Sequence, residues 1–221
     1  MPVLRRSGPP PHPARQPITL QQLRTLKERL FATRTLNLID QEMIWAALTL
    51  AYFGLLRVSE YVSCNAHTFN VDQTLTRRMV NIQPRLLHIS LRASKHDQLG
   101  QGAQLSIGAT GTDICPVEAM RRYLVRKTWP NAETPLFCFS LRQYLTAADI
   151  NFWLCHLLGQ TVTIHCLRIG GTTWAAEAGV HIWQSQAGGR WRSNAYKRYI
   201  RPSPAALSGL TVLITHEPDN Q

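Results

Sequence analysis

Apolar residues dominate one long segment in the first quarter of the chain. From Asp40 to Phe53 they occupy almost every face of a helix. A surface helix carries its apolar residues on a single stripe, so this pattern predicts a buried central helix. Gly54 interrupts the pattern, and we expect a short helix to follow from about Leu56.

Further helices are predicted on both sides of this segment. Thr19 is a suitable N-cap for a helix that begins with Leu20-Gln-Gln. Cys115-Pro116 opens another helix, which runs to about Lys127, because proline is favoured in the first helical turn. Four more helices are expected towards the C-terminus, over residues 141–158, 166–178, 181–187 and 193–200.

The middle of the chain changes to an alternating pattern. Apolar and polar residues alternate over 87–91 and again over 103–107, which is typical of strands. The polar, glycine-rich residues between them predict a β-hairpin with a long tip that carries Lys95. The expected fold class is therefore mainly α with a small antiparallel β-sheet (α+β).

The chain divides into one ordered domain with a segment at each end. Residues 1–17 contain Pro-Pro-Pro and several arginines and have no apolar periodicity, so we expect a flexible, basic, proline-rich tail. The ordered domain is expected over 18–202, where Pro202 ends the last helix. Residues 203–221 begin with a short apolar segment and finish as a polar tail.

Charge points to a polyanionic partner. The 221 residues include 24 Lys and Arg against 13 Asp and Glu, a net charge of +11. Binding to a polyanion is favoured because each neutralised phosphate releases condensed counterions. The excess is concentrated between Thr163 and Arg201, where Glu177 is the only acidic residue. The basic residues there are Arg168, Arg190, Arg192, Lys197, Arg198 and Arg201.

The cysteines and the hydropathy exclude several classes of protein. The five cysteines are scattered and never form a Cys-x-x-Cys pair, which argues against a disulfide scaffold and a zinc ribbon. We therefore expect no metal site. No apolar run approaches the ~18 residues of a membrane span and no signal peptide precedes the domain, so we expect an intracellular protein without a membrane partner.

Arg57 is the first candidate for chemistry. It lies in an otherwise apolar stretch, where a charge must be paired or functional. A structural ion pair with Glu60, three residues on, is one reading. The other is that Glu60 orients Arg57 for a phosphate, and both can hold.

A second group of candidates lies near the C-terminus. His165 and Arg168 are three residues apart on one predicted helix, so both point the same way. They lie at its start, and the N-terminal end of a helix favours anions. Trp191 is by default a packing residue, although its indole N–H can donate to a phosphate oxygen. Tyr196 and Tyr199 are also three residues apart, and composition does not decide which of them would be a nucleophile.

These motifs together resemble the tyrosine recombinase (phage integrase) family. The matching phrases occur in the family's order over about Pro17 to Arg201: Gly54-Leu-Leu-Arg57-Val-Ser-Glu60, Ser-Lys95-His-Asp-Gln-Leu-Gly, His165-Cys-Leu-Arg168-Ile-Gly-Gly-Thr-Thr, and Gly189-Arg-Trp191 with Tyr199-Ile-Arg. The last phrase is similar to recombinases of Crypton and DIRS-type mobile elements. The resemblance implies that 18–202 is a tyrosine recombinase catalytic domain.

The resemblance also implies roles for individual residues. Arg57 and Arg168 would bind the phosphate, with Glu60 in support, and Lys95 would protonate the leaving 5′ oxygen. His165 and Trp191 would complete the site, and Tyr199 would attack a DNA phosphodiester to give a 3′-phosphotyrosyl link, without ATP or metal. The basic residues around the tyrosine would contact double-stranded DNA: Arg190, Arg192, Lys197 and Arg201.

Partners and location follow from the same resemblance. Family members act as tetramers on two duplexes, and the apolar segment 205–214, within 203–221, matches the position of a helix that docks into a neighbouring protomer. Only a short tail precedes Pro17, so we expect DNA affinity and site choice to depend on sequence outside this chain. The mobile-element likeness implies a nuclear location in a eukaryote, and otherwise the cytoplasm or nucleoid.

Three other readings remain open. Trp191 and Tyr199 are eight residues apart where many members have nine, so Tyr196 remains a competing nucleophile. A non-catalytic DNA-binding protein derived from a mobile element would share the basic surface. A type IB topoisomerase-like nicking and closing enzyme would share the same site residues.

Overall fold

The computed structural model describes residues 15–92, 102–159, 162–191 and 193–208. Lys95 and Arg192, two of the predicted site residues, lie outside these ranges, as do most of the N-terminal tail and the C-terminal segment. Among the described residues, none of the helices combines the length and the apolar character that a membrane crossing needs.

Two N-capped helices begin the domain. α1 (Leu20–Ala32) starts at Thr19, whose side chain accepts from the backbone N–H of Gln22 while the Gln22 side chain accepts from the backbone N–H of Thr19. This reciprocal capping box confirms the predicted start. α2 (Leu38–Phe53) begins before the predicted Asp40, because Asn37 caps it.

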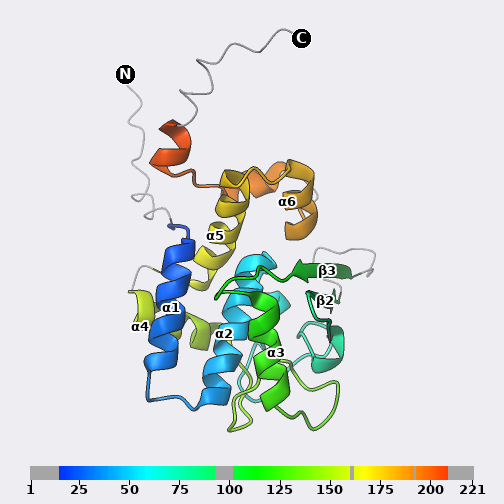
Figure 1. Ribbon diagram of the computed structural model, residues 1–221. Coiled ribbons are helices and arrows are strands. Elements are labelled where there is room, and N and C mark those ends of the chain that lie inside the picture. The colour runs from blue at the N-terminus through cyan, green and yellow to red at the C-terminus, as the bar shows by residue number, and fades with distance from the viewer. Residues whose placement is uncertain (1–14, 93–101, 160–161, 192, 209–221) are drawn as a thin grey trace, which may run out of the picture.

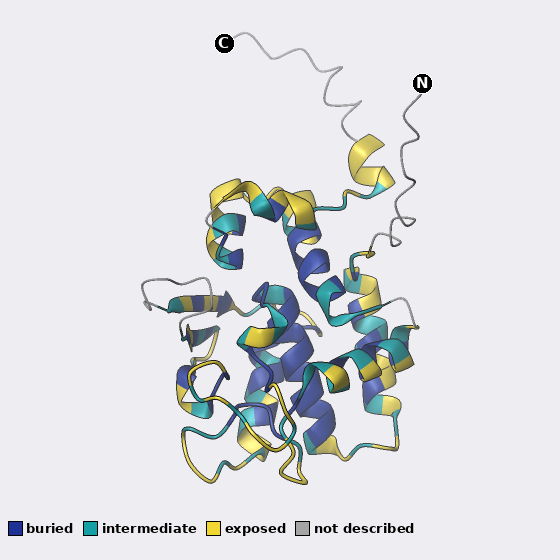
Figure 2. Cartoon of the chain, turned by 180° about the vertical axis from the view of Figure 1, so that it is seen from behind, coloured by how far each residue is buried: buried dark blue, intermediate teal, exposed yellow. Residues whose placement is uncertain are grey.

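α2 is the central helix of the domain. Every residue from Asp40 to Tyr52 is buried, as the sequence pattern predicted. α2 packs against α1, α3 (Pro116–Arg126) and α5 (Ile164–Glu177). In Figure 2 it runs dark blue through the middle of the molecule.

The β-sheet is small, antiparallel and set to one side of the helices (Figure 1). The predicted hairpin is present as β2 (Leu86–Leu91) and β3 (Ala103–Gly108), with Leu87 opposite Ile107. A strand that the sequence did not predict, β1 (Val80–Ile82), adds to β2 on its other edge.

The remaining helices differ from prediction mainly at their ends. α4 (Ala147–Leu158) begins at residue 147 and not at 141, because Thr146 and Asp149 form a capping box. α5 starts two residues earlier than expected, at Ile164. The structure also contains α6 (Ile182–Gly189) and the 3-10 helices η1 (Val58–Glu60), η2 (Arg77–Met79) and η3 (Asn194–Tyr199).

α5 lies unusually close to its neighbours. A Cβ on Gly170 would lie 2.2 Å from the carbonyl oxygen of Ile18, and a Cβ on Gly171 would lie 2.2 Å from that of Tyr52. These paired glycines therefore allow the backbone of α5 to contact α2 and the residues that precede α1. This contact brings the first turns of α5 to the C-terminal end of α2.

Candidate active site

Four segments distant in sequence meet at the C-terminal end of α2. They are the turn from Gly54 to η1, the first turns of α5, the end of α6 with residues 189–191, and η3. Figure 1 shows α5 and α6 gathered above this end of α2. The predicted site residues inside the described ranges all lie here.

Arg57 and Glu60 form the ion pair that the sequence suggested. Arg57 Nη1 donates to Glu60 Oε1 at 2.9 Å, and the Arg57 backbone N–H donates to Oε2 at 2.7 Å. The Glu60 side chain is 8% exposed and that of Arg57 is 35% exposed. In the described part of the chain only Glu60 accepts from the Arg57 guanidinium, so the fork retains donors for a further anion.

Arg168 is the most deeply placed charge in the site. It lies in the second turn of α5 and is 2% exposed. Its Nη1 donates to the carbonyl oxygen of Leu55 and its Nη2 to that of Gly189, at 2.8 Å. Its Nε is buried and has no hydrogen-bond partner. A guanidinium so placed ties α5 to the α2–η1 turn and to the end of α6.

The surroundings of Arg168 disfavour its charged form. Burial, with the positive charges of Arg57 and Arg190, lowers its pKa to about 10, although the carboxylate of Glu60 opposes the shift. Desolvation and like charges both disfavour the charged form. The group nevertheless remains protonated at neutral pH, so three guanidinium groups surround the single carboxylate of Glu60. Such an excess of positive charge suits an anionic ligand.

Aromatic rings cover Arg168. Its guanidinium carbon lies 4.4 Å from the centre of the Trp191 ring and 5.1 Å from that of Tyr199. Both distances are within the range of cation–π attraction. Gly189 makes room for the indole, because a Cβ there would lie 1.7 Å from Trp191 Cζ3. An anion can therefore reach Arg168 only if these rings move.

The two candidate tyrosines occupy different environments. Tyr196 is buried, 4% exposed, in a small apolar cluster with Leu55 and Trp191. Tyr199 is only partly buried, and its ring centre lies 5.2 Å from that of Trp191 and 5.3 Å from that of His165. Tyr199 thus contacts the candidate site residues, while Tyr196 packs beneath Trp191.

His165 is half-buried at the start of α5. Burial lowers its pKa, and the positive charges of Arg15, Arg168 and Arg201 act in the same direction. A lowered pKa keeps the imidazole neutral at neutral pH. A neutral ring beside Tyr199 can accept a proton.

The predicted DNA-contacting residues separate into two groups. Lys197 is exposed on η3, and the Arg201 side chain donates to the carbonyl oxygens of Arg198 and Ile200 at the edge of the site. Arg190 is directed inward, with a side chain 14% exposed. Its Nη2 donates to Glu60 Oε2 at 2.7 Å.

The inward direction of Arg190 is the feature that sequence reasoning missed. Its neighbours in sequence are basic, which suggested a DNA-facing cation. Its backbone has a φ of 56°, in the left-handed region, where it ends α6. An arginine directly after Gly188-Gly189 is a weak signal of such a helix end, because that position normally selects glycine.

A metal centre is not formed by the described residues. No group of three His, Cys, Asp or Glu side chains lies close enough together in those ranges to hold an ion.

Solved structures with the same fold are tyrosine recombinases and integrases. The XerA recombinase superposes with a TM-score of 0.66 at 20% sequence identity, over 96% of this chain and 68% of that one. XerH site-specific recombinase, solved bound to palindromic difH substrate in a post-cleavage complex, gives 0.65 at 13% identity, over 91% and 54%. The Tn1549 transposon integrase, solved in complex with circular intermediate DNA, gives 0.60 at 14% identity, over 95% and 69%.

These likenesses establish the fold, which is that of the tyrosine recombinase catalytic domain, mainly α with a small antiparallel sheet, as predicted. No family model matches the sequence, and neither does any curated protein. The chain spans between about half and about two thirds of the length of the structures it matches.

Proposed function

We propose that this chain is the catalytic domain of an enzyme that cuts and rejoins DNA through a covalent 3′-phosphotyrosyl intermediate on Tyr199. One observation carries the proposal. The Tyr199 ring lies against His165, Arg168 and Trp191, in a site where three arginines surround one carboxylate. A phenol beside an excess of positive charge suits attack on a phosphodiester.

The packing favours Tyr199 over Tyr196 as the nucleophile. Tyr196 is fixed under Trp191 and Leu55 at 4% exposure, so its movement would open the apolar cluster. Tyr199 is partly buried and ends η3, directly before Ile200 and Arg201. Its carbonyl oxygen accepts from the Thr173 hydroxyl at 3.0 Å, which anchors its backbone to α5 while the ring remains at the rim.

The reaction consists of two phosphoryl transfers. In the first, the Tyr199 hydroxyl loses its proton and its oxygen attacks phosphorus, the bond from phosphorus to the 5′ oxygen breaks, and that oxygen takes a proton. In the second, a 5′ hydroxyl attacks the phosphotyrosine, restores the phosphodiester and returns the phenol. Each step exchanges one phosphate ester for another, so neither ATP nor a metal ion is required.

The site residues divide this work between them. Neutral His165 can accept the phenol proton from Tyr199, and the free donors of Arg57 can bind a non-bridging oxygen. Arg168 would stabilise the negative charge on the non-bridging oxygens in the transition state, once the incoming phosphate displaces the rings of Trp191 and Tyr199. Lys95, the expected proton donor to the 5′ oxygen, lies outside the described residues.

Double-stranded DNA is the proposed partner. The net charge of +11 and the exposed Lys197 and Arg198 beside the site suit a phosphate backbone. Since the chain spans only part of the recombinases of the same fold, a clamp around DNA, a tetrameric assembly and docking by residues 203–221 are proposals for the complete protein. So are an origin in a transposable element and a nuclear location.

A nicked suicide substrate tests the proposal directly. Cleavage near the nick releases a short fragment and traps the covalent protein–DNA adduct, which migrates slowly in a denaturing gel. We expect an adduct with the wild-type protein and with Tyr196→Phe, and none with Tyr199→Phe. Adduct from Tyr199→Phe but not from Tyr196→Phe would reverse the assignment of the nucleophile.

The burial of Arg168 favours one alternative. With both terminal nitrogens on carbonyl oxygens and aromatic rings above it, Arg168 also fits a DNA-binding protein whose site no longer turns over. DNA binding by the wild-type protein without any adduct, on a substrate that carries the correct site, would support this alternative. Relaxation of supercoiled DNA without strand exchange would instead indicate a topoisomerase-like activity.

A further inference from the structure

Glu60 is shared by two arginines from opposite ends of the domain. Its Oε1 accepts from Arg57 at 2.9 Å, and its Oε2 accepts from Arg190 at 2.7 Å. Arg190 is 130 positions further along the chain than Glu60. The carboxylate is thus a bridge between the turn that carries Arg57 and the turn that carries Trp191.

Both terminal nitrogens of Arg190 donate to acceptors of the protein. Besides Glu60, its Nη1 reaches the carbonyl oxygens of Gly54 and Gly188, at 3.2 and 2.7 Å, and its Nη2 that of Leu55, at 3.2 Å. Its Nε is buried without a partner. No donor of this guanidinium is directed to the surface where a DNA backbone would lie.

Two strained backbone positions meet at this contact. Leu55 and Arg190 both have a positive φ, of 48° and 56°. A non-glycine residue in the left-handed region is strained, and such positions persist where surrounding contacts hold them. The hydrogen bond from Arg190 to the Leu55 carbonyl oxygen joins these two turns directly.

We propose that Arg190 is a positioning residue of the DNA-cleavage site and not a ligand of the DNA backbone. This inference rests on the proposed function. By fixing Oε2 of Glu60, Arg190 turns Oε1 towards Arg57 and sets the direction of the Arg57 fork. By bonding to Gly54 and Leu55, it also fixes the turn that holds Trp191 over Arg168.

Arg190→Gly is the most informative variant. Glycine adopts a positive φ without cost, so the substitution removes the guanidinium while it relieves the backbone. We expect adduct formation on the suicide substrate to slow by about 100-fold, because small displacements of a catalytic group have effects of that size. Affinity for duplex DNA and its dependence on salt should stay at the wild-type values.

Lys197→Ala is the matched control for a phosphate contact. Lys197 is exposed on η3, and loss of one such contact lowers the slope of log affinity against log salt by about 0.9. The slope should fall in Lys197→Ala and not in Arg190→Gly. A fall of that size in Arg190→Gly would show that Arg190 contacts phosphate and would overturn the inference.

Added methylguanidinium separates positioning from a general structural role. It should restore part of the adduct rate of Arg190→Gly, because it can occupy the vacated position between Glu60 and the carbonyl oxygens. A slow variant without rescue would show that Arg190 only supports the fold. Adduct formation by Arg190→Gly at the wild-type rate would show that Arg190 has no role in cleavage. A wild-type protein that forms no adduct would overturn the proposed function and this role together.

Discussion

The guanidinium carbon of Arg168 lies 4.4 Å from the centre of the Trp191 ring, although Arg168 lies on α5 and Trp191 in the turn after α6. The indole covers a cation that is 2% exposed. On its other side it packs against Tyr196 and Leu55. Trp191 therefore closes the site and belongs to its apolar support at the same time.

Trp191→Ala should lower the stability of the domain. The ring is 8% exposed, and truncation of a large buried aromatic residue costs about 3–5 kcal/mol because it leaves a cavity. The substitution also exposes Arg168 to water on one side. Urea unfolding followed by circular dichroism measures the change in the free energy of unfolding.

Trp183→Ala is the control for this loss. Trp183 lies on α6, a few residues before Trp191, and is 63% exposed. Its truncation should change the free energy of unfolding by less than about 0.5 kcal/mol. Equal losses in the two variants would contradict the packing of Trp191 against Arg168.

Gly189→Ala should displace the indole without altering any polar group. The added Cβ would lie 1.7 Å from Trp191 Cζ3, so the ring or the turn must shift. We expect a loss of about 1–3 kcal/mol in stability, the usual cost of overpacking, and slower adduct formation. Tryptophan fluorescence and near-ultraviolet circular dichroism would report the change in the environment of the ring.

The adjacent glycine provides the comparison. A Cβ on Gly188 meets nothing within 4 Å. Gly188→Ala should therefore be neutral or stabilise α6 by up to about 1 kcal/mol, because alanine loses less conformational entropy in a helix. If both alanine variants behaved alike, the close contact between Gly189 and Trp191 would be wrong.

The elements of this fold were predictable where local signals were strong. Thr19 and Cys115-Pro116 indicated where helices start, and the alternation of apolar and polar residues indicated β2 and β3. Both signals are local, because a helix cap and the two-residue repeat of a strand depend only on residues close in sequence. β1 was missed because a strand of three residues is defined by its pairing with β2 and has little pattern of its own.

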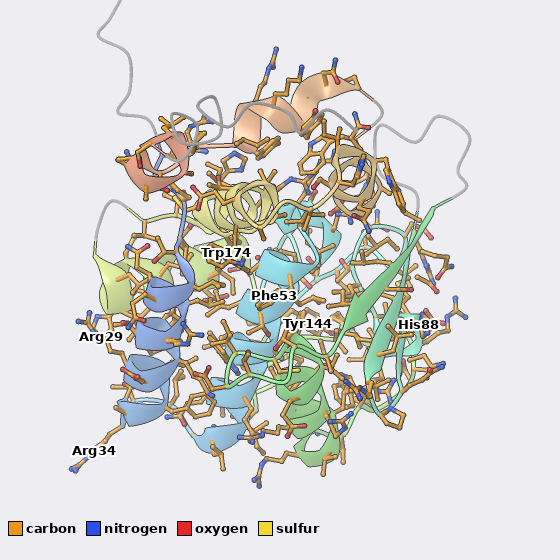
Figure 3. All side chains as sticks on the ribbon, turned by 45° about the horizontal axis from the view of Figure 1, so that its top comes forward. Arg29, Arg34, Phe53, His88, Tyr144 and Trp174 are labelled. Atoms are coloured by element: carbon orange, nitrogen blue, oxygen red, sulfur yellow. The ribbon has the colours of Figure 1, made fainter. Side chains whose placement is uncertain are left out.

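The sequence pointed to residues that the structure brings together, but not to their contacts with one another. Their spacing suggested that Arg57 and Glu60 would pair, since residues three positions apart on a helix are neighbours. The contact between Glu60 and Arg190 depends on the tertiary fold, and so does the burial of Tyr196. Arg34, by contrast, is exposed and extends from the surface of the domain in Figure 3.

His165 should make stability depend on pH. Burial and neighbouring positive charges hold its pKa in the folded state below its ordinary value of 6.5. The unfolded chain therefore takes up this proton at a higher pH than the folded chain does. The stabilisation is complete above the unfolded pKa and is lost as pH falls towards the folded pKa.

His165→Gln tests this linkage. Urea unfolding between about pH 7.5 and about pH 5 should show a smaller loss of stability on acidification in the variant than in the wild type. Groups that titrate equally in both proteins cancel in the difference. Parallel curves for the two proteins would show that His165 does not take up its proton at a lowered pH.

Gly171→Ala should affect the site through the fold alone. Its Cβ would lie 2.2 Å from the Tyr52 carbonyl oxygen and 2.7 Å from Leu55 Cδ2. Since backbone atoms of α2 cannot yield, α5 must move away, and we expect a loss of about 1–3 kcal/mol in the free energy of unfolding. Because the Leu55 carbonyl oxygen accepts from Arg168, this movement should also slow adduct formation.

The helical Gly188→Ala variant serves as the reference for Gly171→Ala, because it adds the same methyl group to open space. The two effects of Gly171→Ala, on unfolding and on adduct formation, should occur together, since both depend on the separation of α5 from α2. Full stability with slow adduct formation would mean that Gly171 acts in the site and not in the helix contact. Full activity and full stability would mean that α5 and α2 do not approach as closely as the structure describes.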